Sequence, residues 1–183
     1  MREELKFILG HINEWLKFAE SKGTATVVVN VACALGILQL IKAATEANQA
    51  LVYYAYAVIG MLLLSTAICL TSFIPQLLMP WFVGRGTPKA TDNLLFFGHV
   101  AKYPPKPYLA KLYMHLDQSE PESFPEIELH YAEEIVTNAR ITLRKYRAFS
   151  LAAWLSIIAI ATPPVALLLY VADRCCKHQA PDS

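Results

Sequence analysis

The chain has 183 residues, of which 55 % are hydrophobic and 17 % are charged, and its formal net charge is +1 at pH 7. This hydrophobic content exceeds that of ordinary water-soluble domains, and the small net charge does not indicate a nucleic acid polymer as partner. Asp, Glu, Lys and Arg are absent from 23–41, 47–84 and 148–172, which are runs of 19, 38 and 25 residues. Because about 20 apolar helical residues cross a ~30 Å hydrocarbon core, each run predicts one membrane span.

Residues 1–22 have the pattern of an amphipathic helix. Apolar side chains recur at three- and four-residue spacing from Leu5 to Ala19, and charged side chains occupy the other face. Such a helix packs on a partner helix or lies in the membrane interface, with Trp15 at headgroup depth. We expect Gly23 to separate it from the first span. Because this mixed-charge segment precedes the apolar run, we expect no cleavable signal peptide.

The first predicted span, 23–42, contains the strongly polar residue Asn30. An amide in hydrocarbon needs a hydrogen-bond partner, so we expect Asn30 to face another helix. Ala32 and Gly36 form a small-xxx-small pair, which permits close helix approach. Asn30 and Gly36 are therefore the candidate helix-packing residues.

The second predicted span, 51–75, is bounded by aromatic residues and prolines. Three tyrosines within 53–56 mark one membrane interface, and Trp81 and Phe82 mark the other. Pro75 and Pro80 close the span, because proline lacks the amide donor that a helix needs.

Residues 84–147 are the one sizeable polar segment, for which we predict a small helical unit. Composition and periodicity predict a loop at 84–88, short helices at 91–102 and 108–116, an acidic linker at 117–126 and a long helix at 126–147. No glycine or proline separates the long helix from the third predicted span, 148–172, so we expect it to continue into that span. Pro163 and Pro164 predict a kink in the span's second half.

The distribution of Lys and Arg predicts the orientation. Four of these residues precede the first span and nine lie between the second and third, whereas only Lys42, Arg174 and Lys177 lie on the other side. Thirteen against three is a clear positive-inside bias. The amino terminus and the 84–147 unit are therefore predicted to be cytoplasmic, and the 173–183 tail external.

No residue spacing predicts catalysis or metal binding. The five histidines are scattered, and His130 with Glu133 and Glu134 lacks the second histidine of a zinc helix. The run from Cys175 to His178 is too compressed for tetrahedral ligation by one chain. We therefore expect a protein that is not an enzyme, with no catalytic residue, metal or cofactor.

A group of cationic and aromatic residues in the 84–147 unit is the candidate ligand site. Aromatic faces stack on bases, while Lys and Arg hold phosphate, so this mixture suits a nucleotide-like ligand. The same residue types are also ordinary anchors at a bilayer surface, and this alternative stays open. The candidate nucleotide-binding residues are Lys102, Tyr103, Lys106, Tyr108, Arg140, Arg144 and Lys145.

Three passages carry a family resemblance. They are HINEWLKFAESK at 11–22, DNLLFFGHVAKY at 92–103, and the segment 134–148 before the last span. Together they resemble the Pycsar transmembrane effector family of bacterial anti-phage proteins. Phe97, Gly98 and Lys102 match the family's cytoplasmic motif, and Glu20 and Lys22 match the motif before the first span.

The resemblance implies a multi-pass protein of the bacterial inner membrane, encoded beside a pyrimidine cyclase. A cyclic pyrimidine mononucleotide, cyclic CMP or cyclic UMP, would activate it during infection to impair that membrane and cause abortive infection. The chain shows no separate cyclic-nucleotide-binding domain, so direct sensing falls to the 84–147 unit.

The sequence thus predicts an all-α integral membrane protein with three transmembrane helices, an amphipathic N-terminal helix and a small helical cytoplasmic unit. We expect a self-associating effector, a homo-oligomer in the lipid bilayer, in which ligand binding shifts the third span. The alternative is an accessory or structural membrane subunit without a nucleotide ligand. A membrane enzyme is disfavoured, because the spans lack paired carboxylates and metal ligands.

Overall fold

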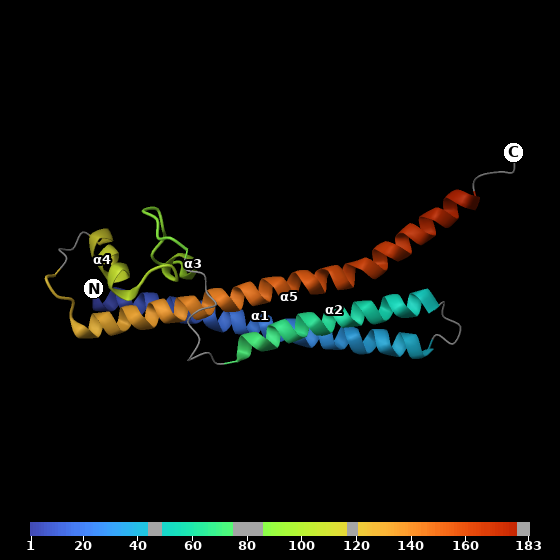
Figure 1. The fold of residues 1–183 in the computed structure, drawn as a ribbon, viewed down its shortest axis with the longest axis horizontal. Coiled ribbons are helices and arrows are strands. Elements are labelled where there is room, and N and C mark those ends of the chain that lie inside the picture. The colour runs from blue at the N-terminus through green and yellow to red at the C-terminus, as the bar shows by residue number, and fades with distance from the viewer. Residues whose placement is uncertain (44–48, 75–85, 117–120, 179–183) are drawn as a thin grey trace. The chain divides into compact units, whose positions relative to one another are not determined.

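The fold is shown in Figure 1 as a computed structural model, which describes residues 1–43, 49–74, 86–116 and 121–178. The described residues contain five helices and no strand, which confirms the all-α class. The helices are α1 (Arg2–Ala43), α2 (Gln49–Phe73), α3 (Phe97–Val100), α4 (Pro105–His115) and α5 (Glu126–His178). Of these, α1, α2 and α5 are each long and apolar enough to cross a membrane.

The chain divides into two compact units. Unit 1 comprises Met1–Gly23 and Ser72–Phe149, and unit 2 comprises Thr24–Thr71 and Ser150–Ser183. Helices α1 and α5 each contribute residues to both units. The predicted boundaries of the spans remain predictions, because helix ends do not locate a bilayer.

Helix α1 differs from its prediction at Gly23. We expected Gly23 to separate two helices, but α1 runs from Arg2 to Ala43 without a break, so that prediction is wrong. A glycine inside a helix costs only about 1 kcal/mol relative to alanine, which favourable neighbours easily offset. A Cβ at Gly23 would lie 3.5 Å from the Phe73 ring, so the missing side chain leaves room for that aromatic residue.

The segment 91–102 also differs from its prediction, because only Phe97–Val100 is helical. The preceding residues form turns in which side chains take the backbone donors. Asp92 Oδ2 accepts from the Lys89 N–H at 2.7 Å, and Asn93 Oδ1 accepts from the Leu95 N–H at 2.8 Å. Short polar side chains commonly compete with helix formation in this way.

The two remaining helices of this segment follow the sequence more closely. Helix α4 begins at Pro105, earlier than predicted, because proline fits the first turn of a helix, where its missing N–H has no intrahelical partner. Helix α5 is continuous from Glu126 to His178 and passes through Pro163 and Pro164, near which it bends (Figure 1). The predicted linker residues 117–120 and the boundary residues 75–85 lie outside the described residues.

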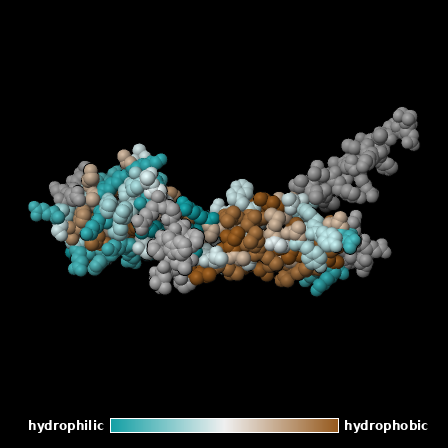
Figure 2. Space-filling model, viewed as in Figure 1, coloured by the Kyte–Doolittle hydropathy of each residue, from teal (hydrophilic) through white to brown (hydrophobic). Residues whose placement is uncertain are grey.

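The two units have different interiors. The core of unit 1 combines aliphatic residues of α1, such as Leu5 and Ile12, with Tyr108 and Leu109 of α4 and Ile135 of α5. The smaller core of unit 2 is formed by Ala34, Val58, Ile59, Leu62 and Ala159. In unit 2 many large apolar side chains face outward, including Trp154 at 63 % exposure, and Figure 2 shows a broad hydrophobic surface there.

Candidate functional site

The three passages that carry the family resemblance meet in unit 1 through an aromatic cluster. Trp15, Phe97 and Tyr146 come from α1, α3 and α5, one from each passage. The Phe97 and Tyr146 rings stack at 5.1 Å with an interplanar angle of 19°, and Trp15 lies 5.7 Å from Phe97 and 6.1 Å from Tyr146. Passages far apart in the sequence therefore build one site.

Charged residues of the same passages pair beside this cluster. The Lys145 ammonium donates a short hydrogen bond to Glu20. The Lys22 ammonium lies 4.3 Å from the Phe18 ring centroid and 5.6 Å from that of Phe149, within cation–π range. Lys145, a candidate phosphate ligand, thus already has a carboxylate partner.

Asp92 organises the loop that follows Gly86. Its Oδ1 accepts from the Lys102 ammonium at 2.7 Å, and its Oδ2 accepts from the Lys89 N–H and lies 3.1 Å from the Tyr103 hydroxyl. The Lys102 ammonium and then the Lys89 N–H hold the pKa of the Asp92 carboxyl well below its usual range. Lys102 is therefore tied to a nearly buried carboxylate.

Tyr103 and Tyr108 are core residues in this structure. The Tyr103 side chain is buried, and the Lys111 ammonium donates to its hydroxyl at 2.7 Å. Tyr108 is fully buried, and its hydroxyl donates to the Leu94 carbonyl at 3.0 Å. Neither ring presents a face on which a base can stack.

Arg140 fastens the loop to α5. Its Nε donates to the Ala101 carbonyl at 3.2 Å and its Nη2 to the Tyr103 carbonyl at 2.8 Å. Lys102 lies between Ala101 and Tyr103 in the sequence, so its backbone is held against α5. Arg140 itself is half-buried and supports the loop.

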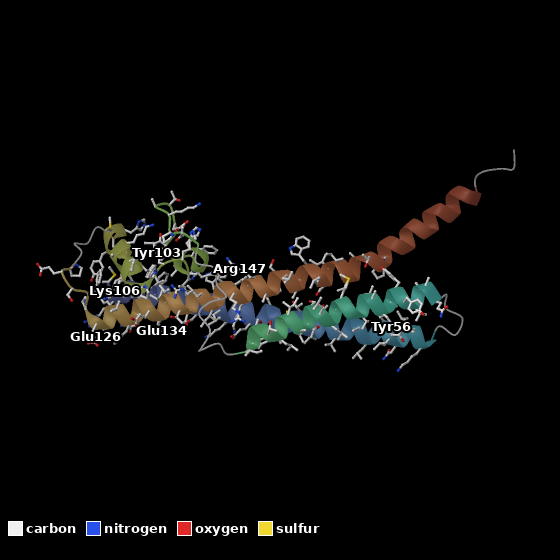
Figure 3. The ribbon with its side chains drawn as sticks, viewed as in Figure 1. Tyr56, Tyr103, Lys106, Glu126, Glu134 and Arg147 are labelled. Carbon is white, nitrogen blue, oxygen red and sulfur yellow. The ribbon has the colours of Figure 1, made fainter. Side chains whose placement is uncertain are left out.

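Lys106 and Arg144 differ from the other candidates. Lys106 is exposed, Arg144 is half-buried, and neither side chain has a hydrogen bond or ion pair to another described residue. Arg144 follows Arg140 by one helical turn, so it lies on the same face of α5 as the held loop. Figure 3 shows Lys106 toward the Glu126 end of α5 and Arg147 toward the other end of unit 1. The seven candidates therefore do not surround one point.

A cavity of about 610 Å³ in unit 1 lies beside the loop but lacks cationic lining. Among the described residues that line it, the ionisable ones are Glu4, Asp92 and His115, and none is Lys or Arg. Two carboxylates disfavour a phosphate diester, so this cavity does not suit the anionic part of a nucleotide.

In unit 2 the candidate Asn30 is buried and Gly36 is exposed. The Asn30 Nδ2 donates to the Ser65 Oγ at 2.9 Å, which joins α1 to α2. A Cβ at Gly36 would meet no atom within 4 Å, so no described residue packs against this position. Among the described residues no group of three or more His, Cys, Asp or Glu side chains is placed to hold a metal ion.

The helical fold and the three candidate spans define the class of helical membrane proteins. A model of the Pycsar effector protein domain matches residues 4–172, and the chain therefore belongs to this family. No curated protein and no solved structure matches the chain. Family membership supports a role as an anti-phage membrane effector, and the family is one of membrane effectors rather than of enzymes.

Asp92 is the organising residue that the sequence reasoning missed. It is the only carboxylate residue within 47–116, a stretch that contains five Lys and Arg residues. A lone carboxylate among so many cations is a signal for an ion-paired structural centre. Ser65 and Ser156 carried no such signal, because serines are common in membrane helices.

Proposed function

We propose that this protein is an anti-phage effector that impairs the bacterial inner membrane when a cyclic pyrimidine mononucleotide, cyclic CMP or cyclic UMP, binds unit 1. The observation that carries the proposal is the convergence of the three family passages on the Trp15, Phe97 and Tyr146 cluster. Unit 1 faces the cytoplasm, where the nucleotide is made, and the chains act as a homo-oligomer whose activity causes abortive infection.

Arg144 is the proposed phosphate contact. It has no partner among the described residues, it lies one turn from Arg140, and Arg140 holds the loop that carries Lys102. An arginine that has no salt bridge can give both forks of its guanidinium to a cyclic phosphate. Lys102 lies on the same loop, where its ion pair with Asp92 fixes its position.

Exposed aromatic rings replace the buried tyrosines in the proposed base contact. Phe96 is 41 % exposed and adjoins Phe97, and the half-exposed His99 lies 5.3 Å from the Phe96 ring centroid. Ligand binding at this loop shifts α5, the helix that carries Arg144, and the population of open assemblies rises.

The test is nucleotide binding by Arg144 variants. Detergent-purified protein is titrated with cyclic CMP, cyclic UMP and, as a control, cyclic AMP in a calorimeter. Arg144→Ala should weaken pyrimidine nucleotide binding by about tenfold to a hundredfold, the usual effect of losing a charge-assisted contact, and Arg144→Lys should retain part of it. Lys106→Ala removes an exposed cation elsewhere in unit 1 and should bind like wild type.

Cells that also express a pyrimidine cyclase supply the functional readout. Wild-type protein should depolarise them, whereas Arg144→Ala should insert normally and leave the membrane potential intact. If Lys106→Ala abolished depolarisation and Arg144→Ala did not, the phosphate contact would instead be Lys106 on α4. If neither nucleotide binds wild-type protein, direct sensing is wrong. That result would favour the alternative of an accessory or structural membrane subunit without a nucleotide ligand.

A further inference from the structure

The three spans of unit 2 are joined by hydrogen bonds between polar side chains inside an otherwise apolar bundle. Asn30 on α1 donates to Ser65 on α2 at 2.9 Å, and the Ser65 and Ser156 hydroxyls lie 2.8 Å apart. The Ser156 hydroxyl donates to the Ala152 carbonyl on α5 at 3.0 Å. We call Asn30, Ser65 and Ser156 the polar relay.

The relay is buried inside unit 2. Asn30 is 1 % exposed, Ser65 is 0 % and Ser156 is 7 %, whereas apolar neighbours on the same helices face outward. Figure 1 shows α1, α2 and α5 side by side in this unit. The surrounding bundle excludes lipid from the relay, so its polar groups depend on one another for hydrogen bonds.

The relay leaves one polar atom unsatisfied. The Asn30 Oδ1 is buried and has no hydrogen-bond partner among the described residues. Turning the amide over would only exchange the roles of its oxygen and nitrogen, so one of the two stays unpaired in either orientation. A buried polar group without a partner favours any state in which water reaches it.

Each described span contributes one member, and the member on α5 belongs to the same helix as Arg144. A shift of α5 along or about its axis therefore separates Ser156 from Ser65. The parted relay exposes the Asn30 amide and the Ser65 hydroxyl inside the bundle, where water is the small molecule that can satisfy them.

We propose that the polar relay is the internal gate of the effector: intact, it holds the three spans closed, and parted, it draws water into the bundle and makes the membrane leak. This inference rests on the proposed membrane-impairing function and specifies how the leak is regulated. It requires removal of the Ser65 hydroxyl and removal of the Asn30 amide to have opposite effects.

The two variants differ in what they leave behind. Ser65→Ala deprives the Asn30 amide of its only described partner, so the closed state loses its bond while the polar group that attracts water remains. Asn30→Leu removes that polar group, and Ser65 keeps its contacts to Ser156 and to the Ala152 carbonyl at 2.8 Å. The first variant should open the bundle and the second should keep it closed.

The experiment measures dye release from vesicles of phosphatidylethanolamine and phosphatidylglycerol that contain purified full-length protein. Without nucleotide, Ser65→Ala should raise basal release by about tenfold or more, as expected when the closed state loses the contacts of the Ser65 hydroxyl to Asn30, Ser156 and the Ala152 carbonyl. Asn30→Leu should show no basal increase and a blunted response to cyclic CMP and cyclic UMP. Thr66→Val is the matched control, because among the described residues the Thr66 hydroxyl bonds only the Leu62 carbonyl of its own helix.

A reversible disulfide lock between α2 and α5 controls for variants that fail to fold, because the same protein is measured in its oxidised and reduced forms. In a chain whose four native cysteines are replaced, Ser65→Cys with Ser156→Cys places two thiols where the hydroxyls lie 2.8 Å apart, close enough for a disulfide between α2 and α5. Oxidised protein should not leak with nucleotide, and reductant should release the lock and allow leakage.

Two results would overturn the gate. One is equal basal release from Ser65→Ala and Thr66→Val at matched reconstitution, and the other is full nucleotide response from the oxidised lock. A wild-type protein that ignores both nucleotides would instead refute the proposed signal, while the nucleotide-free comparison of Ser65→Ala with Thr66→Val would still decide the gate.

Discussion

Unit 1 and unit 2 are stabilised by different means. Unit 1 packs tyrosines such as Tyr108 and Tyr113 with their hydroxyls bonded, and ion pairs such as Asp92–Lys102 hold its loops. In the described part of unit 2 no ion pair occurs, and large apolar residues face outward. This difference is typical of the contrast between a part that contacts water and a part that contacts lipid, although α1 and α5 belong to both units.

The strongest test of this comparison is to determine on which side of the membrane unit 1 and the carboxyl terminus lie. We expect a phosphatase or fluorescent reporter inserted between Glu122 and Ser123 of unit 1 to report the cytoplasm. The same reporter joined after Ser183 should report the external side, because thirteen of sixteen Lys and Arg residues fall on the predicted inner side. Reports from the same side at both positions would refute three spans.

The next largest effect concerns the buried tyrosine of unit 1. Tyr108→Ala removes a fully buried ring and should destabilise unit 1 by about 3–5 kcal/mol, whereas Tyr108→Phe loses only the bond to Leu94 and should cost about 1 kcal/mol. The fluorescence of Trp15, with Trp81 and Trp154 replaced by Phe, reports thermal unfolding of this unit. Equal stability of Tyr108→Ala and wild type would mean that the ring is not core and is free to meet a ligand.

A smaller effect should appear on acidification. The folded state lowers the pKa of Asp92, so its contribution to stability is full above the ordinary aspartate pKa of 3.8 and is lost as the pH falls below that value. Between about pH 6 and about pH 3, wild-type unit 1 should lose more stability than Asp92→Asn, as followed by Trp15 fluorescence. Parallel pH profiles would contradict the role of Asp92 as the charged centre of the loop.

The smallest effect is expected at Gly36 of unit 2. Because no described atom lies within 4 Å of the position that a Cβ would take there, Gly36→Ala should change the stability of a single chain by about 1 kcal/mol or less. The bulkier Gly36→Ile should lower homo-oligomer formation, measured by cross-linking in membranes, if copies approach through Ala32 and Gly36. Unchanged cross-linking would mean that the face of α1 with Ala32 and Gly36 does not contact another copy.

The sequence predicted the helices whose apolar side chains must be buried or placed in lipid. Charge-free runs located α2 and the apolar parts of α1 and α5, because the cost of burying charge in hydrocarbon is large and local in sequence. The fate of Gly23 could not be predicted, since its weak helix penalty competes with packing against Phe73, a residue about fifty positions away. The shortness of α3 depends on hydrogen bonds to Asp92 and Asn93, which periodicity does not register.

The candidate residues were chosen by residue type, and the partners that they have in the fold could not be predicted from residue type. Lys102, Arg140 and Lys145 do lie in one folded unit, but each contacts a protein partner. Composition cannot tell a buried tyrosine from a stacking one, and Tyr108 became core because helix periodicity turns its face of α4 inward. Arg144 remains the proposed phosphate contact because no described carboxylate forms an ion pair with it. This could be seen only in the fold.

The first turns of α1 find their partners very late in the chain. Asn13 bonds Asn138 and Glu20 pairs with Lys145, each across 125 residues. During synthesis the amino-terminal segment must therefore wait, with part of its apolar face uncovered, until the ribosome has made the first part of α5. A truncated product that ends before α5 cannot close unit 1, so chaperones or proteases meet that exposed face first.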